Sequence, residues 1–321
     1  MERTIDVTAL GELLIDFTES GLSPQGNPLL EANPGGAPCN LLAMLARLGH
    51  RTAFLGKVGR DAFGDMLRQR VSGVGVDVSG LRVDENIPTT LAFVHTQPGG
   101  ERDFSFYRKP GADLMLGEDE VDFEKIASSR VFHFGTLSST GEPARSATRA
   151  ALACAKDHGC LISFDPNLRP PLWDSLDRAR EEIDFGLSQC DVLKISDNEI
   201  EFMTGETDID AGISKLLQRH PIPLVLATMG PGGSKAFFRG QTVFAPPKLT
   251  EKTIETTGAG DTFGGCALHF VLQYGLDGLN EDRLHQMLSF ANAAASLVTT
   301  RKGALCVMPT PEEVRDYMAR D

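Results

Sequence analysis

Short apolar runs alternate with longer amphipathic runs along most of this chain, and this alternation limits the folds that it can adopt. A strand followed by a crossover helix is the repeating unit of a parallel sheet. The pattern therefore predicts a doubly wound α/β sandwich with a mostly parallel central sheet. Strands are expected over 5–11, 52–58, 131–135, 161–165, 191–195 and 223–228, and helices over 39–48, 61–71, 143–157, 211–218, 262–274 and 284–299.

Two stretches interrupt the alternation, about 13–34 and 87–112. Their sequences LLIDFTES, TTLAFVHT and RDFSFYR alternate in polarity like antiparallel strands, and turn residues such as those at 97–100 divide them. We expect these stretches to pair into one small sheet that forms a lid over a crevice at the strand ends. Because no flexible linker divides the chain, one domain is expected over 1–321.

Charge and apolar content narrow the class of partner. The formal net charge is -13, whereas nucleic-acid-binding proteins need a basic surface, so a small-molecule ligand fits better. No run approaches the roughly 18 apolar residues of a membrane span, and no cleavable leader precedes the first predicted strand, so we expect a cytoplasmic protein that contacts no membrane. The six cysteines lack CxxC spacing, which favours reduced thiols over disulfides or a zinc site.

The segment ETTGAGDTFGGC, over 255–266, combines an anion site with a carboxylate. Gly258, Ala259 and Gly260 precede a predicted helix, so their N–H groups lie where the helix dipole attracts anions. Asp261 follows directly. If the anion is a nucleotide γ-phosphate and the attacking group is an alcohol, the amides stabilise the transferring phosphoryl group and Asp261 accepts the hydroxyl proton. The alternative is an ordinary aspartate near a helix N-terminus.

Two more glycine-rich segments fit a ligand crevice. PGGAP, over 34–38, leads into a predicted helix, so its backbone can approach a substrate and Asn40 can hydrogen-bond that substrate. TMGPGG, over 228–233, follows the last predicted parallel strand and suits a nucleotide wall or a hairpin turn. Each segment alone is also compatible with an ordinary loop.

Five segments in this order resemble the ribokinase/PfkB family of sugar kinases. They are PGGAPCNLLAMLARLG (34–49), GKVGRDAFG (56–64), DPNLRPPLW (165–173), KISDNEIEFMTG (194–205) and ETTGAGDTF (255–263). The third and fourth look most like fructokinases. The resemblance covers nearly the whole chain and implies a ribokinase-like three-layer α/β/α sandwich with a β-sheet lid. It also implies transfer from ATP with Mg²⁺ to a primary hydroxyl of fructose, and a homodimer that uses the lid.

The same resemblance assigns roles to individual residues. It makes Asp261 the general base, with Gly258, Ala259 and Gly260 as the anion hole. It implies that Glu199 organises Mg²⁺ through water, and that Glu255 and Thr257 adjoin a monovalent cation such as K⁺. The matched sugar-binding positions are Asp16, Gly35, Gly36, Asn40, Arg108 and Arg169, and the matched nucleotide positions are Lys194, Thr228, Gly230, Gly233 and Asn292.

Some of these assignments have alternatives. The two arginines could form surface ion pairs, and Asn292 could be a helix-packing residue. Ser196 replaces the asparagine of the family's NxxE element, which puts direct help to the metal from that position in doubt. Glu255 replaces an aspartate beside the cation, and its extra methylene could preserve, shift or abolish that site. Leu42 stands where the family has a small residue, which we interpret as local packing.

Other functions remain open at this point. A 2-keto-3-deoxygluconate kinase would use the same two arginines for the carboxylate of its sugar, and a ribokinase-like kinase of another sugar is a third reading. An inactive sugar- or nucleotide-binding regulator is disfavoured because Asp261 and the whole GAG element are present. A dinucleotide oxidoreductase is disfavoured because no G-x-G-x-x-G follows the first strand.

Overall fold

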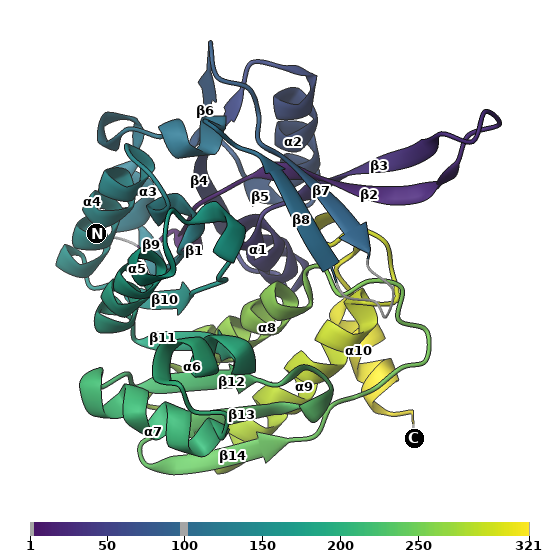
Figure 1. Cartoon of the computed structure of the whole chain (residues 1–321). Helices are drawn as coiled ribbons and strands as arrows, with labels where there is room; N and C mark the ends of the chain where they lie inside the picture. The colour runs from purple at the N-terminus through teal and green to yellow at the C-terminus, as the bar shows by residue number, and fades with distance from the viewer. Residues whose placement is uncertain (1–2, 97–101, 321) are drawn as a thin grey trace.

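The computed structural model of the chain describes residues 3–96 and 102–320. Within them the main sheet has the order β14-β13-β12-β11-β10-β9-β1-β4-β5, with β6 also paired to β4 (Figure 1). The strands from β12 to β5 are parallel, whereas β13 and β14 add an antiparallel edge. The strands are β1 (Ile5–Leu10), β4 (Thr52–Gly59), β5 (Val76–Asp77), β6 (Leu81–Asp84), β9 (Ser129–Gly135), β10 (Leu161–Asp165), β11 (Val192–Ser196), β12 (Leu224–Thr228), β13 (Ser234–Phe238) and β14 (Gln241–Ala245). The predicted mostly parallel sheet is confirmed.

Helices cover both faces of this sheet. Successive strand residues point to opposite faces, so Val131 packs in one apolar cluster and Phe132 in the other. The first cluster includes α1, α2, α8, α9 and α10, and the second includes α3 to α7, which gives three layers. The helices are α1 (Ala37–Arg47), α2 (Ala62–Gly73), α3 (Phe123–Ala127), α4 (Ala144–Asp157), α5 (Leu176–Gln189), α6 (Asp197–Thr204), α7 (Ile209–Arg219), α8 (Ala259–Tyr274), α9 (Glu281–Val298) and α10 (Pro311–Met318).

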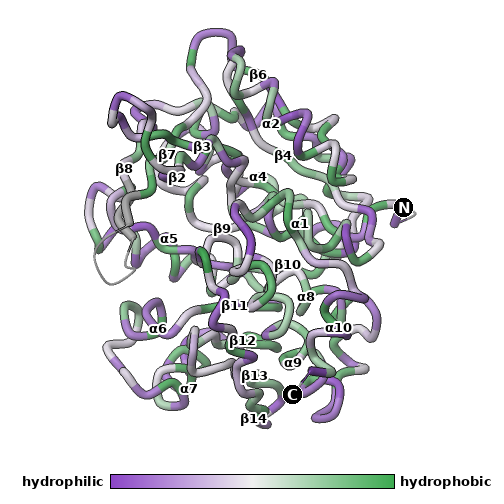
Figure 2. Tube along the Cα trace, turned by 90° about the vertical axis from the view of Figure 1, so that its right-hand side faces the viewer, coloured by the Kyte–Doolittle hydropathy of each residue, from purple (hydrophilic) through white to green (hydrophobic). Residues whose placement is uncertain are grey.

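Hydrophobic residues lie mainly where the helices pack against the two faces of the sheet. Figure 2 shows them along the central strands and the inner sides of the helices, with hydrophilic residues on outer turns. All six cysteines are free thiols. Across residues 3–96 and 102–320, no helix combines the length and the apolar composition that a membrane span requires.

A second, smaller sheet has the order β3-β2-β7-β8, and its strands are β2 (Leu14–Leu22), β3 (Pro28–Gly35), β7 (Leu91–Thr96) and β8 (Arg102–Tyr107). The two interrupting stretches therefore pair with each other as predicted, through a parallel contact between β2 and β7. The β2–β3 hairpin projects from the body (Figure 1) and exposes Leu22, Leu29 and Leu30. The predicted turn at 97–100 lies outside the described residues. The homodimer and the lid role of this sheet stay predictions.

Candidate active site

Two pockets lie where the strands of the main sheet end, and they meet at the N-terminus of α8. The first, here called the nucleotide groove, runs from Thr228 and Gly230 after β12 to Asn292 on α9. The second, here called the polar pocket, lies between the small sheet and the main sheet. Thr256 and Gly260 line both pockets. A molecule in one pocket can therefore meet a molecule in the other at the start of α8.

Helix α8 begins at Ala259, three residues before the predicted start. Gly258 is its N-cap and has a φ of 76°, a left-handed conformation that favours glycine. A Cβ on Gly258 would lie 2.3 Å from the Cβ of Ala304. The backbone N–H groups at 258–260 therefore belong to the cap and first turn, where a helix has no internal acceptors for them. This turn can hold an anion.

Asp261 lies in the same first turn and lines the polar pocket. Asn40 Nδ2, on α1, donates a hydrogen bond of 2.8 Å to its Oδ2. Burial raises the pKa of Asp261 to about 6, and the charge of Asp165 adds to the rise, although Asn40, Lys194 and Arg169 act in the opposite direction. The carboxylate is therefore mostly ionised at neutral pH, yet basic enough to accept a proton.

Lys194, on β11, is the cation beside this carboxylate. Its Nζ lies 3.1 Å from Asp165 Oδ2, and a Cβ on Gly260 would lie 3.1 Å from the same Nζ. Burial lowers the pKa of Lys194, but the charges of Asp165, Glu199 and Asp261 together raise it above its ordinary value. The structure thus places a protonated ammonium in the polar pocket, at the start of α8. The sequence had suggested a place on the nucleotide side.

Glu199 is buried in the first turn of α6 and ties two loops together. Its Oε2 accepts hydrogen bonds from the backbone N–H and the hydroxyl of Ser196, and its Oε1 accepts one of 2.8 Å from the Leu168 N–H. Ser196, the departure from the NxxE pattern, is the N-cap of the helix. Because both carboxylate oxygens already accept protein donors, Glu199 fits contact with Mg²⁺ through water.

The rest of the donor set agrees with that reading. Across the described ranges, no three His, Cys, Asp or Glu side chains are grouped so that they could hold a metal ion. Magnesium in nucleotide sites is usually held by one or two carboxylates, waters and the phosphates. Glu199 is a buried carboxylate that fits a site of this kind.

The sugar-side residues predicted from sequence mostly converge on the polar pocket. Asp16 from β2 lies over Gly35 so closely that a Cβ on that glycine would be 2.1 Å from Asp16 Oδ2. Asn40 is buried, and its Oδ1 has no hydrogen-bond partner among the described residues. A buried acceptor of this kind normally has a partner. It therefore offers a contact for a ligand hydroxyl beside Asp261.

The two predicted arginines differ in position. Arg169 lines the polar pocket, whereas Arg108 is buried at the end of β8 and does not line it. The guanidinium of Arg108 pairs with Asp113 at 2.6 Å and also donates to the Leu137 carbonyl and the Thr140 hydroxyl. Arg108 is thus engaged inside the fold.

Glu12 is a pocket residue that sequence reasoning missed. It follows β1, is 3% exposed, and lines the polar pocket, where its Oε1 accepts a hydrogen bond of 2.9 Å from the Ala37 N–H. Burial raises its pKa to about 7. The available signal was a carboxylate at the carboxyl end of a buried strand, in the sequence TALGE.

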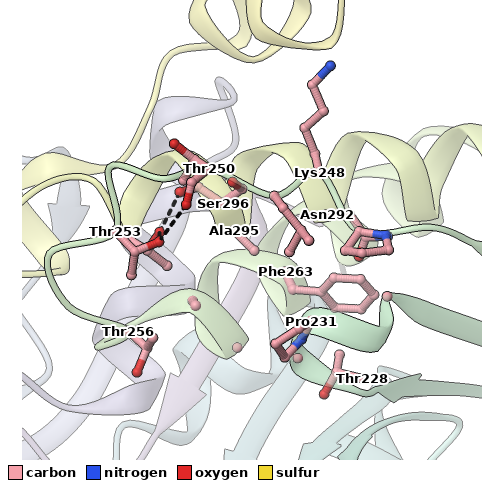
Figure 3. Close-up of a pocket in the computed structure, with 17 residues that line it drawn as sticks. Thr228, Pro231, Lys248, Thr250, Thr253, Thr256, Phe263, Asn292, Ala295 and Ser296 are labelled. Carbon is pink, nitrogen blue, oxygen red and sulfur yellow. Dashed lines mark hydrogen bonds between the residues drawn. The ribbon is translucent and has the colours of Figure 1, made fainter. Parts of the chain in front are cut away.

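The nucleotide groove has apolar walls. Figure 3 shows Pro231, Phe263 and Ala295, from three separate elements, around the groove, and such walls suit a flat base. Gly233 lines it too, and Asn292 donates from Nδ2 to the Pro246 carbonyl at 2.9 Å, which fixes one edge. Four of the five predicted nucleotide residues, Thr228, Gly230, Gly233 and Asn292, thus line one groove, whereas Lys194 lies in the polar pocket. Phe263 was not predicted.

The predicted cation position has an internal contact. Glu255 Oε1 accepts a hydrogen bond of 2.7 Å from the Gly303 N–H, and Thr257 lines the polar pocket. The segment before α8 is thereby tied to the loop after α9.

Known proteins are similar to this chain over nearly its whole length. Residues 4–311 match the model of the pfkB family carbohydrate kinases. Probable fructokinase-2 of Arabidopsis thaliana is 41% identical over 318 residues, which cover 97% of this chain and 95% of the relative. Two solved structures are also similar. The ATP-bound fructokinase of Xylella fastidiosa gives a TM-score of 0.88 at 31% identity, with 98% of each chain covered. The fructokinase of Vibrio cholerae O395 with fructose, ADP and calcium ion gives 0.87 at 30% identity, with 98% of this chain and 99% of that chain covered.

Proposed function

Because this chain belongs to the pfkB family of carbohydrate kinases, we propose that it is an ATP-dependent fructokinase in which Asp261 is the general base. The observation that carries this assignment is the position of Asp261 in the first turn of α8, where the nucleotide groove meets the polar pocket. The fructokinase relatives, at about 40% identity over nearly the full chain, support fructose as the acceptor.

The start of α8 supplies the electrostatic part of the reaction. ATP in the nucleotide groove directs its γ-phosphate to the N–H groups at 258–260, which stabilise the charge of the transferring phosphoryl group together with the Lys194 ammonium. Glu199 would help to hold Mg²⁺ through water, and the metal would supply further neutralisation of the phosphate charge. Asp261 takes the proton from the sugar hydroxyl as the oxygen attacks phosphorus.

The polar pocket holds the acceptor. Asp16 offers carboxylate oxygens, and Asn40 offers a buried amide oxygen, so both can accept from hydroxyl groups of a neutral sugar. Asn40 also donates to Asp261, so the group that binds the sugar also orients the base. Arg169 also lines the pocket and can donate to a ring or hydroxyl oxygen of the sugar.

The substrate assignment is tested by kcat/KM for fructose, 2-keto-3-deoxygluconate and ribose. We expect kcat/KM for fructose to exceed that for each of the other two sugars by at least about tenfold. Arg169→Ala should lower kcat/KM for fructose by a factor that corresponds to less than ~2 kcal/mol, because a neutral sugar loses one hydrogen bond. For an acid sugar held by Arg169, the same substitution would lower kcat/KM by a factor that corresponds to about 2 kcal/mol or more, since the charge of the sugar is left unpaired. Arg180→Ala, on an exposed ion pair, is the matched control. A tenfold lead of the acid sugar that Arg169→Ala abolishes would show that this is an acid-sugar kinase.

Dependence on K⁺ is expected to be weak. Glu255 Oε1 already accepts a hydrogen bond from the Gly303 N–H, so this carboxylate is engaged within the protein. Turnover should therefore change by less than about threefold among K⁺, Na⁺ and a bulky organic cation at equal ionic strength, the size of a weak differential contact. Glu255→Asp, one methylene shorter, should become more dependent on K⁺. Strong, selective activation of the wild type by K⁺ would contradict this prediction.

A further inference from the structure

The β7–β8 hairpin of the small sheet is closed at its neck by a buried carboxylate. Thr90 immediately precedes β7, and Arg108 immediately follows β8. The Thr90 hydroxyl donates to Asp113 Oδ1, while Arg108 Nε and Nη2 donate to Asp113 Oδ2 at 2.8 and 2.6 Å. All three side chains are at most 5% exposed. One carboxylate thus holds both ends of the hairpin, out of contact with water.

The β2–β3 hairpin has the same arrangement. Glu12 lies two residues before β2, and Ala37 lies two residues after β3. The hydrogen bond from the Ala37 N–H to Glu12 Oε1 therefore joins the two ends of this hairpin. Glu12 is as buried as Asp113, at 3% and 4% exposure.

The two necks are connected to each other and to the main sheet. The Ile15 N–H on β2 donates to the Thr90 carbonyl at 3.1 Å, so the β2–β3 hairpin is bonded to the start of the β7–β8 hairpin. Arg108 reaches the 3₁₀ turn after β9 (Leu137–Ser139), through the Leu137 carbonyl at 2.8 Å. Leu137 lines the polar pocket. A tilt of the small sheet away from the main sheet would have to break the buried bond from Arg108 to the Leu137 carbonyl, and loss of a buried hydrogen bond is costly.

We propose that Asp113 and Glu12 are positioning residues that hold the small sheet closed over the polar pocket. Arg108 belongs to this clasp, as the cation that secures the end of β8 to the main sheet. This inference rests on the proposed kinase function, in which a closed cover keeps water from the γ-phosphate. When the cover loosens, water takes the place of the sugar hydroxyl as the acceptor, and ATP is hydrolysed to ADP and inorganic phosphate.

The test uses Thr90, because its side chain joins the clasp but does not line the polar pocket. Thr90→Val removes the hydroxyl at nearly constant volume, and Thr90→Ser keeps it. We expect Thr90→Val to raise the ratio of sugar-independent ATP hydrolysis to fructose phosphorylation by about fivefold, the effect of one lost buried hydrogen bond. The KM for fructose should rise with it while the KM for ATP stays constant. Thr90→Ser should restore both values.

A matched control lies in the main sheet. Thr8 on β1 is fully buried, and its hydroxyl pairs with that of Ser129 at 2.6 Å. Thr8→Val deletes the same group away from either neck, so it should leave the ratio unchanged even where it lowers stability. Asp113→Asn keeps an acceptor for Thr90 but removes the charge that faces Arg108, and where it folds it should raise the ratio further. If Asp113→Asn does not fold, the comparison of Thr90→Val with Thr90→Ser tests the proposal.

Amide hydrogen exchange gives a readout that needs no sugar. Thr90→Val should speed exchange in β7 and β8 and leave exchange in β9 and β10 as in the wild type. A wild type that phosphorylates no fructose would overturn the proposed function, and the exchange data would still decide the clasp. If Thr90→Val changes neither the exchange of β7 and β8 nor the hydrolysis ratio, or if Thr90→Ser fails to restore them, the clasp proposal is wrong.

Discussion

Replacement of Asp261 by asparagine is expected to lower kcat by about two to four orders of magnitude, the usual contribution of a general base. Asparagine has the size of aspartate but cannot accept the hydroxyl proton. The N–H groups at 258–260 stay in place because they belong to the backbone of α8, so the affinity for ATP should change little. Steady-state kinetics and nucleotide titration calorimetry measure the two quantities separately.

The same variant should be more stable than the wild type at neutral pH. The folded-state pKa of Asp261 is about 6, above its ordinary value of 3.8, so the folded protein binds this proton more tightly than the unfolded chain does. Ionisation therefore costs stability, and the cost grows as the pH rises from about 4 to 6 and is constant above that. Asparagine carries no charge, so its gain in Tm should be present at pH 8 and fall away near pH 4.

A control separates the base from a general effect of the first helical turn. Asp177 is in the first turn of α5 and is exposed, so Asp177→Asn changes the same residue type at a similar position. It should leave kcat unchanged. Near wild-type turnover in Asp261→Asn would refute the role of this carboxylate.

Sequence periodicity located most of the main sheet because buried strands and amphipathic helices leave patterns that do not depend on distant partners. Each predicted parallel strand occurs within two residues of its predicted ends. The antiparallel edge, β13 and β14, was missed because its short strands follow a glycine-rich segment that reads as a loop. The helices α3, α5, α6 and α10 were also missed. Helix α6 lies within the segment 194–205 and α5 follows the segment 165–173, and both segments were compared with family motifs rather than examined for helical periodicity.

The start of α8 shows why local rules fail at the site. Glycine within a helix costs about 1 kcal/mol, so Gly260 disfavours an early start, and the predicted helix began after it. Tertiary contacts decide otherwise, since Ala304 packs against Gly258, and Lys194 Nζ lies where a Cβ of Gly260 would be in close contact. Glycine at these positions thus permits the close approach of Ala304 and Lys194 to the start of α8.

The sequence also did not show which charged side chains contact each other. The motif letters indicated that Arg108 and Arg169 were basic residues near the acceptor, but not which carboxylate each would meet. Asp113 is only five positions from Arg108, yet their contact depends on how β8 leaves the small sheet. The carboxylate of Glu12 depends in the same way on the return of the chain from β3. Such pairings follow from the topology, which a single sequence does not provide.

Opposite pH shifts are expected from the two members of the Lys194–Asp165 ion pair. Burial is the largest cause of the raised pKa of Asp261, the charge of Asp165 raises it further, and the charge of Lys194 lowers it. Lys194→Met should therefore raise this pKa, and Asp165→Asn should lower it. Since the acid limb of kcat/KM reports the base of the free enzyme, that limb should move to higher pH in the first variant and to lower pH in the second.

The size of the loss should also differ between these variants. In the proposed reaction, Lys194→Met removes a cation beside the transferring phosphoryl group, and loss of one such electrostatic contact costs about 100-fold or more in turnover. Asp165→Asn keeps that cation, so its loss at pH 8 should be smaller. Profiles of kcat/KM for fructose between pH 5 and 9 measure both effects in one series. If both variants move the acid limb in the same direction, the group that titrates does not lie between these two opposite charges. Asp261 would then not be the base that limits activity at low pH.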